Sequence, residues 1–536
     1  MKKIYLFMLL FCIKNTMYAQ VPVSQNITFR DSLQFSGNSS IASVWGYVDE
    51  TGIEYALVGT NTGMTVVNVN DPTNIFKVAS FAASPVVNSL WREVKAYKNY
   101  AYTVTEGGGG LMITDLSPLP QSNVLPNTFF QFSTVGRAHT LFIDEKGILY
   151  LFGCNAAISN GAMMYDLDSI PGTPVYLGSY TYANGSYIHD GYVRNDTLYA
   201  GHIQNGFFSV VDVRNKQNPV TLATQPTPNL FTHNTWLSAD SKTLFTTDEK
   251  DFSYLAAYDI SDLSNITEVD RVHVPYGDSI SIPHNVYVKN QFAITAWYKE
   301  GIIVHDVTNP KQLVQVGYFD CDQLTSGGLF NKYRGAWGAY PYLPSGNILI
   351  SDILNGLFVV TPTYLPAAYL KGKVTDVSGN AIGGAIVEIT GVSPISRVLT
   401  DNSGNYMIGI ATAGSYTINY SRTGYASQNL PKGLTNGNTA MQNVVLGSVS
   451  AQDYAFVDAN LQPNVGRAAT LYYNLYTAMQ PAKVVVTDVS GKIVLEQPLD
   501  ANQNKVDLQL NGAQGIYFVQ IQQQNRKNSP LKWVKI

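Results

Sequence analysis

Short apolar runs that end in turn residues recur through the first two thirds of the chain. The first copy, GMTVVNVNDP, occupies residues 63–72, and degenerate copies follow at intervals of roughly 45 to 55 residues. Seven copies, the first included, start at Gly63, Gly110, Ala162, Gly206, Leu255, Gly301 and Gly356. The apolar positions lack the 3.6-residue periodicity of amphipathic helices, so they predict strands and argue against helical repeats.

Each copy belongs to a larger unit of four predicted strands. A second apolar run precedes the copy, as in residues 197–201, and a third precedes the second, as in residues 285–288. A fourth run follows the Asp-Pro turn, as in residues 76–81. β-Branched and aromatic residues between turn signals predict a four-stranded antiparallel meander. Repetition of such meanders at a fixed period is typical of propeller blades.

The seventh unit lacks its own fourth strand. After Val360 the chain runs into Pro362, whereas the segment NITFRDSLQF at residues 26–35 stands before the first unit and belongs to none. We expect this segment to supply the missing strand. Closing the ring in this way leaves no exposed sheet edge between the first and last units.

The pattern changes from about residue 369 to short alternating strands with Asp, Ser and Gly turns, which predict small β-sandwiches. The predicted fold is therefore all-β: a seven-bladed β-propeller closed by an N-terminal strand, followed by two small β-sandwich domains. The expected boundaries are residues 20–362 for the propeller and residues 369–446 and 451–536 for the sandwiches.

Residues 1–19 have the pattern of a secretory signal peptide. Lys2 and Lys3 precede an apolar stretch, and Met17-Tyr18-Ala19 precedes Gln20, so we expect cleavage after Ala19. No other apolar run is long enough to span a bilayer. The formal net charge of −4 argues against a nucleic-acid partner.

Two cysteines, Cys154 and Cys321, remain once Cys12 has left with the signal. In an oxidising compartment they either pair or stay buried singly, and we expect two buried thiols. Their spacing fits no zinc motif.

Four of the seven histidines occupy one position of the repeat. His139, His189, His233 and His284 each open the first strand of a unit, and alignment of the other units places Arg92, Trp337 and Val44 at the same position. The first strand of a blade lines the central channel, so these residues are expected to ring one mouth of it. The second strand ends beside the same mouth, with Glu106, Cys154, His202, Asp248 and Asp352.

The histidine series supports two interpretations. In the first, each histidine hydrogen-bonds the adjacent blade and fixes the interface, as repeat proteins do with one polar residue per unit. In the second, neutral imidazoles and a carboxylate hold a divalent transition metal ion, the candidate cofactor. The candidate metal ligands are His139, His189, His233, His284 and Asp248. The candidate ligand-binding residues are Arg92, Glu106, His189, His202, Trp337 and Asp352.

Several strings resemble the LVIVD-repeat, choice-of-anchor B family over about residues 22–362. They are VWGYVD at 44–49, SLWRE at 89–93, HNTW at 233–236 and PHNVYV at 283–288. The resemblance implies a propeller body carried on different surface anchors, and it implies no particular activity.

The two later domains have resemblances of their own. Residues 370–446, with their TDNSGNY turn and GSY strand, resemble the carboxypeptidase regulatory-like, transthyretin-type sandwich, which implies a spacer role. Residues 451–536, with DVSGK, GIYF and the basic strand KWVKI, resemble the C-terminal sorting domain of the type IX secretion system in Bacteroidetes. That resemblance implies the secretion machinery as a partner and a secreted or outer-membrane cell-surface location.

These observations predict a secreted or surface-anchored binding or scaffold protein that engages an unknown extracellular ligand or protein at the histidine-lined mouth. The alternative is a metal-dependent hydrolase or lyase with Asp248 or Glu106 as base. The chain contains no nucleophile elbow, His-Glu-x-x-His or Walker motif, so catalytic residues are not assigned.

Overall fold

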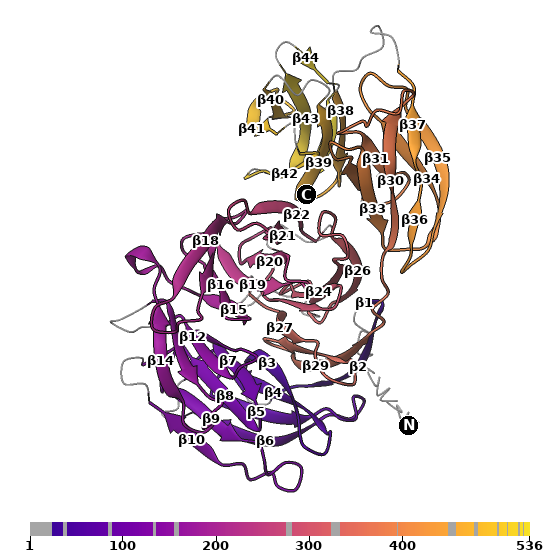
Figure 1. Cartoon of the computed structure of the whole chain (residues 1–536). Coiled ribbons are helices and arrows are strands. Elements are labelled where there is room, and N and C mark those ends of the chain that lie inside the picture. The colour runs from indigo at the N-terminus through magenta and orange to yellow at the C-terminus, as the bar shows by residue number, and fades with distance from the viewer. Residues whose placement is uncertain are drawn as a thin grey trace, which may run out of the picture.

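The structure is a computed structural model, and it describes residues 24–35, 40–83, 88–131, 136–154, 160–274, 281–322, 333–393, 395–448, 457–475, 481–500, 503–511, 513–523, 526–528 and 530–536. The expected signal peptide lies outside these residues. The described chain is all-β, apart from a 3₁₀ turn at Ala183–Gly185, and it consists of many small, mostly antiparallel sheets (Figure 1). No helix among the described residues is both long and apolar enough to cross a membrane.

The first three sheets each contain four antiparallel strands that are consecutive in the chain. The first sheet contains β3 (Ile41–Val48), β4 (Glu54–Thr60), β5 (Gly63–Asn68) and β6 (Phe76–Ala82). The second contains β7 (Arg92–Tyr97), β8 (Tyr100–Thr105), β9 (Leu111–Asp115) and β10 (Asn127–Phe130). The third contains β11 (Thr140–Ile143), β12 (Ile148–Phe152), β13 (Ala162–Asp166) and β14 (Val175–Tyr180).

The next three sheets repeat this arrangement. The fourth contains β15 (Asp190–Arg194), β16 (Thr197–His202), β17 (Phe207–Asp212) and β18 (Val220–Pro226). The fifth contains β19 (Thr232–Leu237), β20 (Thr243–Asp248), β21 (Leu255–Asp259) and β22 (Thr267–Val272). The sixth contains β23 (Val286–Lys289), β24 (Phe292–Ala296), β25 (Ile302–Asp306) and β26 (Val314–Phe319), and it gains β1 (Ser24–Gln25) at its edge.

The seventh sheet takes its fourth strand from the N-terminus. It contains β27 (Ala336–Tyr340), β28 (Ile348–Asp352) and β29 (Gly356–Pro362), and β2 (Ile27–Leu33) pairs antiparallel with β29. The prediction that residues 26–35 supply the missing strand is confirmed. The two N-terminal strands therefore join two different sheets, because β1 pairs with β26 and β2 pairs with β29. Asn26, with a φ of 55°, separates β1 from β2.

The aspartate that ends five of the seven repeat copies has a local structural role. In five of the sheets its Oδ1 accepts a hydrogen bond of 2.8–2.9 Å from the backbone N–H two residues later. A side chain that caps its own turn in this way fixes the departure of the chain toward the fourth strand. These residues are Asp115, Asp166, Asp212, Asp259 and Asp306.

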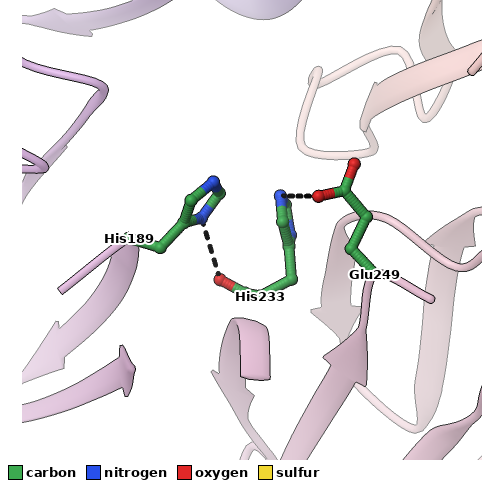
Figure 2. Close-up of side chains that lie close together, drawn as sticks. All are labelled: His189, His233 and Glu249. Carbon is green, nitrogen blue, oxygen red and sulfur yellow. Dashed lines mark hydrogen bonds and ion pairs between the residues drawn. The ribbon is translucent and has the colours of Figure 1, made fainter. Parts of the chain in front are cut away.

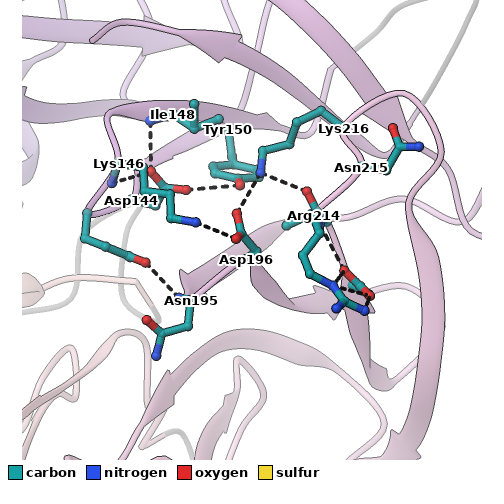
Figure 3. Close-up of polar contacts among 12 residues, drawn as sticks. Asp144, Lys146, Ile148, Tyr150, Asn195, Asp196, Arg214, Asn215 and Lys216 are labelled. Atoms are coloured by element: carbon teal, nitrogen blue, oxygen red, sulfur yellow. Dashed lines mark hydrogen bonds and ion pairs between the residues drawn. The ribbon is translucent and has the colours of Figure 1, made fainter.

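Neighbouring sheets are joined by polar contacts at the ends of the strands that lie away from the four histidines. Between the third and fourth sheets, Asp196 accepts hydrogen bonds from Lys146 at 2.5 Å and from Lys216 at 3.0 Å (Figure 3). The backbone N–H of Asn195 donates to Glu145. Lys146 is half exposed, so this cluster aligns the sheets more than it stabilises the fold.

Two further pairs of sheets follow, each pair around its own apolar core. The first pair contains β30 (Ala368–Asp376), β31 (Ile386–Ile389), β32 (Ser396–Leu399), β33 (Asn405–Ile410), β34 (Gly414–Ser421), β35 (Gln428–Leu434), β36 (Thr439–Met441) and β37 (Val444–Leu446). The second contains β38 (Val457–Gln462), β39 (Ala468–Leu475), β40 (Ala482–Asp488), β41 (Ile493–Leu499), β42 (Lys505–Gln509), β43 (Gly515–Gln523), β44 (Arg526–Lys527) and β45 (Leu531–Lys535). Strands β36 and β37 pair in parallel with β30.

The first C-terminal pair of sheets contacts the sixth sheet, and the second pair contacts the fifth sheet (Figure 1). Asp306 accepts hydrogen bonds from the N–H of Ala367 at 2.8 Å and from the hydroxyl of Tyr369 at 2.9 Å. Lys505 donates to Asp270 at 2.9 Å and to the carbonyl oxygen of Arg271. Lys505, Asp270 and Arg271 line a cavity of about 1070 Å³ whose lining contains none of the four histidines of the repeat.

The pairing of β2 with β29 predicts a specific cross-link. Thr28 and Thr361 face each other across the pair, and directly opposed residues of antiparallel strands lie within the Cα distance that a disulfide spans. We expect Thr28→Cys/Thr361→Cys to form a disulfide under mild oxidation, detected by mass spectrometry of a tryptic digest. Ser32→Cys/Thr361→Cys is the out-of-register control, and it should stay reduced. Free thiols in the first variant, or equal cross-linking in both, would contradict the pairing.

Candidate functional site

Four imidazole rings form a continuous row across consecutive sheets. The ring centroids of His139 and His189 lie 4.0 Å apart, those of His189 and His233 lie 4.3 Å apart, and those of His233 and His284 lie 4.1 Å apart. The row continues to Trp337 at 4.2 Å, and Trp337 stacks on Trp91 at 4.7 Å. The repeat position identified in the sequence therefore brings these side chains together.

A repeated hydrogen bond holds three of the histidines in place. The Nδ1 atom of each lies near the backbone carbonyl oxygen of the corresponding residue in the next sheet: His189 near His233 O at 3.4 Å, His233 near His284 O at 3.1 Å, and His284 near Trp337 O at 2.5 Å. A carbonyl oxygen only accepts, so Nδ1 carries the proton and a neutral ring keeps Nε2 as an acceptor. The interpretation that each histidine fastens the adjacent repeat is confirmed for these three.

The three fastened rings are neutral near pH 7. Burial lowers the pKa of His189, His233 and His284 well below the ordinary value of 6.5, and neighbouring imidazoles lower it further. The imidazolium form is disfavoured because it would lose its hydration inside the row. Each ring therefore presents an uncharged Nε2 lone pair.

His139 lies in a different electrostatic environment at one end of the row. Its Nδ1 lies 2.7 Å from Oε1 of Glu106. Burial acts to lower the pKa of His139, but the hydrogen bond and the charge of Glu106 outweigh it and raise the pKa. The same hydrogen bond lowers the pKa of Glu106. The carboxylate of Glu106 therefore favours the imidazolium form of His139, and the two groups pair at the edge of the row.

A second carboxylate, Glu249, approaches the middle of the row. Its Oε2 lies 3.8 Å from His233 Nε2 and its Oε1 lies 3.9 Å from His284 Nε2. The hydroxyl of Tyr298 donates to Oε1 at 2.7 Å. Burial raises the pKa of Glu249 to about 7, although the hydrogen bond from Tyr298 acts against this shift. The ligand atoms of His189, His233 and Glu249 lie within 4.8 Å of one another (Figure 2).

Sequence alignment placed three of the second-strand residues, His202, Asp248 and Asp352, one position before the position that Glu106 occupies. The strands β8, β16, β20 and β28 end at Thr105, His202, Asp248 and Asp352. Glu106 and Glu249 both follow such a strand end. Because successive side chains of an extended chain point to opposite sides, only one of the two positions faces the histidines. Glu249 can be identified in the sequence because, like Glu106, it directly follows the second strand of its sheet.

The candidate residues at the other strand ends form hydrogen bonds with residues outside the row. His202 lies between the hydroxyls of Ser186 and Ser209, at 2.8 and 2.9 Å. Asp248 Oδ2 accepts the N–H of Asn229 at 2.6 Å. Asp352 accepts the backbone N–H groups of Leu354 and Asn355. The structure therefore assigns local structural contacts to His202, Asp248 and Asp352.

The other residues of the repeat position, Arg92, Val44 and Trp337, lie in different surroundings. Arg92 is buried, and its Nε donates to the carbonyl oxygen of Thr60 at 2.8 Å. Val44 belongs to an apolar core between the first and seventh sheets. Trp337 extends the imidazole row with its ring. Cys154 and Cys321 are free and buried, as expected.

A layer of charged groups and then one of aromatic rings follow the row along the first strands. Lys95 and Glu93 form a buried ion pair at 3.0 Å, and Asn234 donates to Asp190 at 2.7 Å. Further along, aromatic side chains contact one another across the sheets. They are Trp45, Phe142, Tyr192, Trp236, Tyr287, Tyr340 and Tyr342. These rings follow the row along the first strands, whereas Glu106 and Glu249 come directly after the ends of the second strands β8 and β20.

Comparison with known families identifies three segments of the chain. Residues 91–123 match the LVIVD repeat, residues 369–447 match the carboxypeptidase regulatory-like domain, and residues 468–535 match the secretion system C-terminal sorting domain. No curated protein matches the chain. The chain thus carries a type IX C-terminal sorting domain, and the protein is secreted or attached to the outer-membrane surface.

The contacts of His202 predict a structural role. Replacement by Ala removes the imidazole that bonds to the buried hydroxyls of Ser186 and Ser209, although Ser186 keeps its bond to Asn205. It also leaves a void beside Phe207, which stacks on the imidazole at 4.3 Å. We expect His202→Ala to lower the free energy of unfolding by about 2–4 kcal/mol, measured by urea denaturation. Lys146→Ala, at an exposed side chain, should leave it nearly unchanged. Equal stability of both variants would refute this role.

Proposed function

We propose that the protein is a cell-surface or secreted binding protein whose ligand binds at the histidine row. In this proposal residues 20–362 form a seven-bladed propeller closed by β2. Several observations support the ring. The seven sheets follow one another in the chain, β27 of the last sheet contacts β3 of the first, and the imidazole row crosses the first strands of consecutive sheets.

The two later domains complete the proposed organisation. Residues 369–446 form a β-sandwich that serves as a spacer, and residues 451–536 form a β-sandwich that engages the type IX secretion machinery. The separate apolar cores of the two pairs of sheets support this division. The hydrogen bonds of Asp306 to Ala367 and Tyr369 place the spacer directly against the sixth sheet.

The single observation that carries the binding role is the unsatisfied acceptor of His284 at the row. His284 is 1% exposed, and its Nε2 has no hydrogen-bond partner among the residues that the structure describes. The nearest carboxylate atom is Glu249 Oε1 at 3.9 Å, which is too far for a hydrogen bond. Buried polar atoms in folded proteins almost always have partners. A ligand that supplies a donor or a cation would satisfy this acceptor.

The surroundings of the row restrict the ligand to a compact, polar molecule or ion. Glu106 and Glu249 place carboxylates at two points of the row, so a donor-rich or cationic ligand is favoured. Trp91, which is half-buried, extends the site with a stacked aromatic face. Convergent polar groups beside aromatic rings are typical of small-ligand sites.

A metal-dependent hydrolase or lyase is the second candidate. The observation that favours it is a carboxylate beside two imidazoles, with the ion pair of Glu106 and His139 at the end of the same row. In that case Glu106 would act as the base, because Asp248 bonds to Asn229 and lies outside the group of candidate metal ligands. Binding is the simpler proposal because it requires only the acceptors and not turnover.

Thermal-shift measurements on the full chain test the binding role. The panel contains polyamines, inorganic phosphate, and mono- and disaccharides. We expect one of these classes to raise the melting temperature of the wild type but not that of Trp91→Ala/His284→Gln, because a ligand stabilises only the state that binds it. Lys146→Ala is the matched control and should respond like the wild type. Equal shifts in all three proteins, or no shift in any, would contradict binding at the row.

A further inference from the structure

Three side chains at the row bring metal-ligating atoms to a single point. His233 Nε2 and Glu249 Oε2 lie 3.8 Å apart, and the ligand atom of His189 lies within 4.8 Å of both (Figure 2). The separation of 3.8 Å is too long for a hydrogen bond. Two atoms bound to one zinc ion at about 2.0–2.1 Å lie about 3.4 Å apart in a tetrahedron. The spacing is therefore close to that of two ligands of one ion.

Both imidazoles are already oriented as metal ligands. Nδ1 of His189 and Nδ1 of His233 donate to the carbonyl oxygens of His233 and His284. A histidine that binds a metal ion through one nitrogen characteristically donates its other N–H to a carbonyl oxygen or carboxylate, which fixes the tautomer and the ring plane. The inter-sheet hydrogen bonds thus supply the outer contacts of a metal site.

The carboxylate is oriented as well. Tyr298 donates to Glu249 Oε1 at 2.7 Å, so Oε2 is the oxygen directed toward His233. The N–H of Glu249 bonds to the carbonyl oxygen of Phe231, which anchors the backbone at the end of β20. Glu249 therefore reaches the row from a fixed position.

The unpartnered Nε2 of His284 is an independent indication of a bound group. It lies beside the same carboxylate, at 3.9 Å from Oε1, and His284 is almost fully buried. The rings of His233 and His284 are 4.1 Å apart, so a water or substrate atom at an open position of the ion would come within reach of this acceptor. His139 lies outside the group of side chains whose ligand atoms converge at this point.

We propose that His189, His233 and Glu249 bind a divalent transition metal ion, with Tyr298 positioning the carboxylate and His284 facing the open coordination position. This assignment rests on the proposed binding role of the row and specifies the ligand. Two imidazoles and one carboxylate suit Zn²⁺ and its neighbours in the first transition row. Calcium would require six to eight oxygen ligands, which this set does not supply. Three protein ligands with an open fourth position are typical of zinc sites that bind exchangeable ligands.

Metal analysis of the untagged full chain tests the site. The protein is loaded with ZnCl₂, dialysed against metal-free buffer and analysed by elemental mass spectrometry, and its affinity is measured by competition with a chromophoric chelator. We expect the wild type to retain one equivalent of zinc. Glu249→Gln keeps the size of the side chain but removes its charge, and should weaken binding at least tenfold. Tyr298→Phe removes only an outer contact and should weaken binding by about tenfold.

Glu145→Gln is the matched control because it makes the same change at an exposed carboxylate that bonds to the backbone N–H of Asn195, away from the row. It should retain one equivalent with unchanged affinity. Circular dichroism and melting temperatures verify that every variant is folded. Retention of less than about a tenth of an equivalent by the wild type would overturn the site. Unchanged zinc affinity in Glu249→Gln would overturn it as well.

The same measurements separate this proposal from the binding role itself. If the wild type retains no zinc, but a saccharide, phosphate or polyamine stabilises it and not Trp91→Ala/His284→Gln, the metal assignment fails and the binding role stands. If the wild type retains no zinc and no member of the panel distinguishes it from that variant, both proposals fail.

Discussion

The hydrogen bond from each imidazole Nδ1 to the carbonyl oxygen of the next sheet is the contact on which the centre of the molecule depends. It joins residues about fifty positions apart in the chain, such as His233 and His284, through side-chain and backbone atoms of the same repeat position. Because the acceptor is a carbonyl oxygen, the bond fixes the tautomer as well as the spacing. One interaction thereby fastens consecutive sheets and directs the remaining ring nitrogen away from the fastened backbone.

Two carboxylates divide the row into chemically different parts. Glu106 pairs with His139 and raises its pKa, whereas burial keeps His189, His233 and His284 neutral. Glu249 faces neutral rings, so it gains no ion pair from them and burial raises its pKa. A carboxyl group with a raised pKa beside free Nε2 acceptors is an arrangement that a cation would stabilise. The row therefore has the pair of His139 and Glu106 at its edge and uncharged imidazole acceptors in its middle.

The sequence pattern predicted most of the β-structure because strand alternation and turn chemistry are local. The repeated Asp caps its own turn, and the strand taken from residues 26–35 followed from counting strands per unit. Glu249 was missed because Asp248 is one residue nearer the apolar run, and the register of a strand end is fixed by pairing that the sequence does not show. The contact of Lys505 with Asp270 joins two domains and leaves no periodic signal. The extra edge strand β1 is likewise too short for a pattern.

The protonation of the row can be observed directly. Selective ¹⁵N labelling of histidine in a deuterated background, followed by long-range ¹H–¹⁵N correlation spectra, assigns each ring nitrogen as protonated or free. The structure predicts that His189, His233 and His284 are neutral with the proton on Nδ1, and that His139 is protonated on both nitrogens. Variants that replace each histidine by Gln assign the signals. If these three rings carry the proton on Nε2, the inter-sheet hydrogen bonds do not exist and the acceptors that define the site are absent.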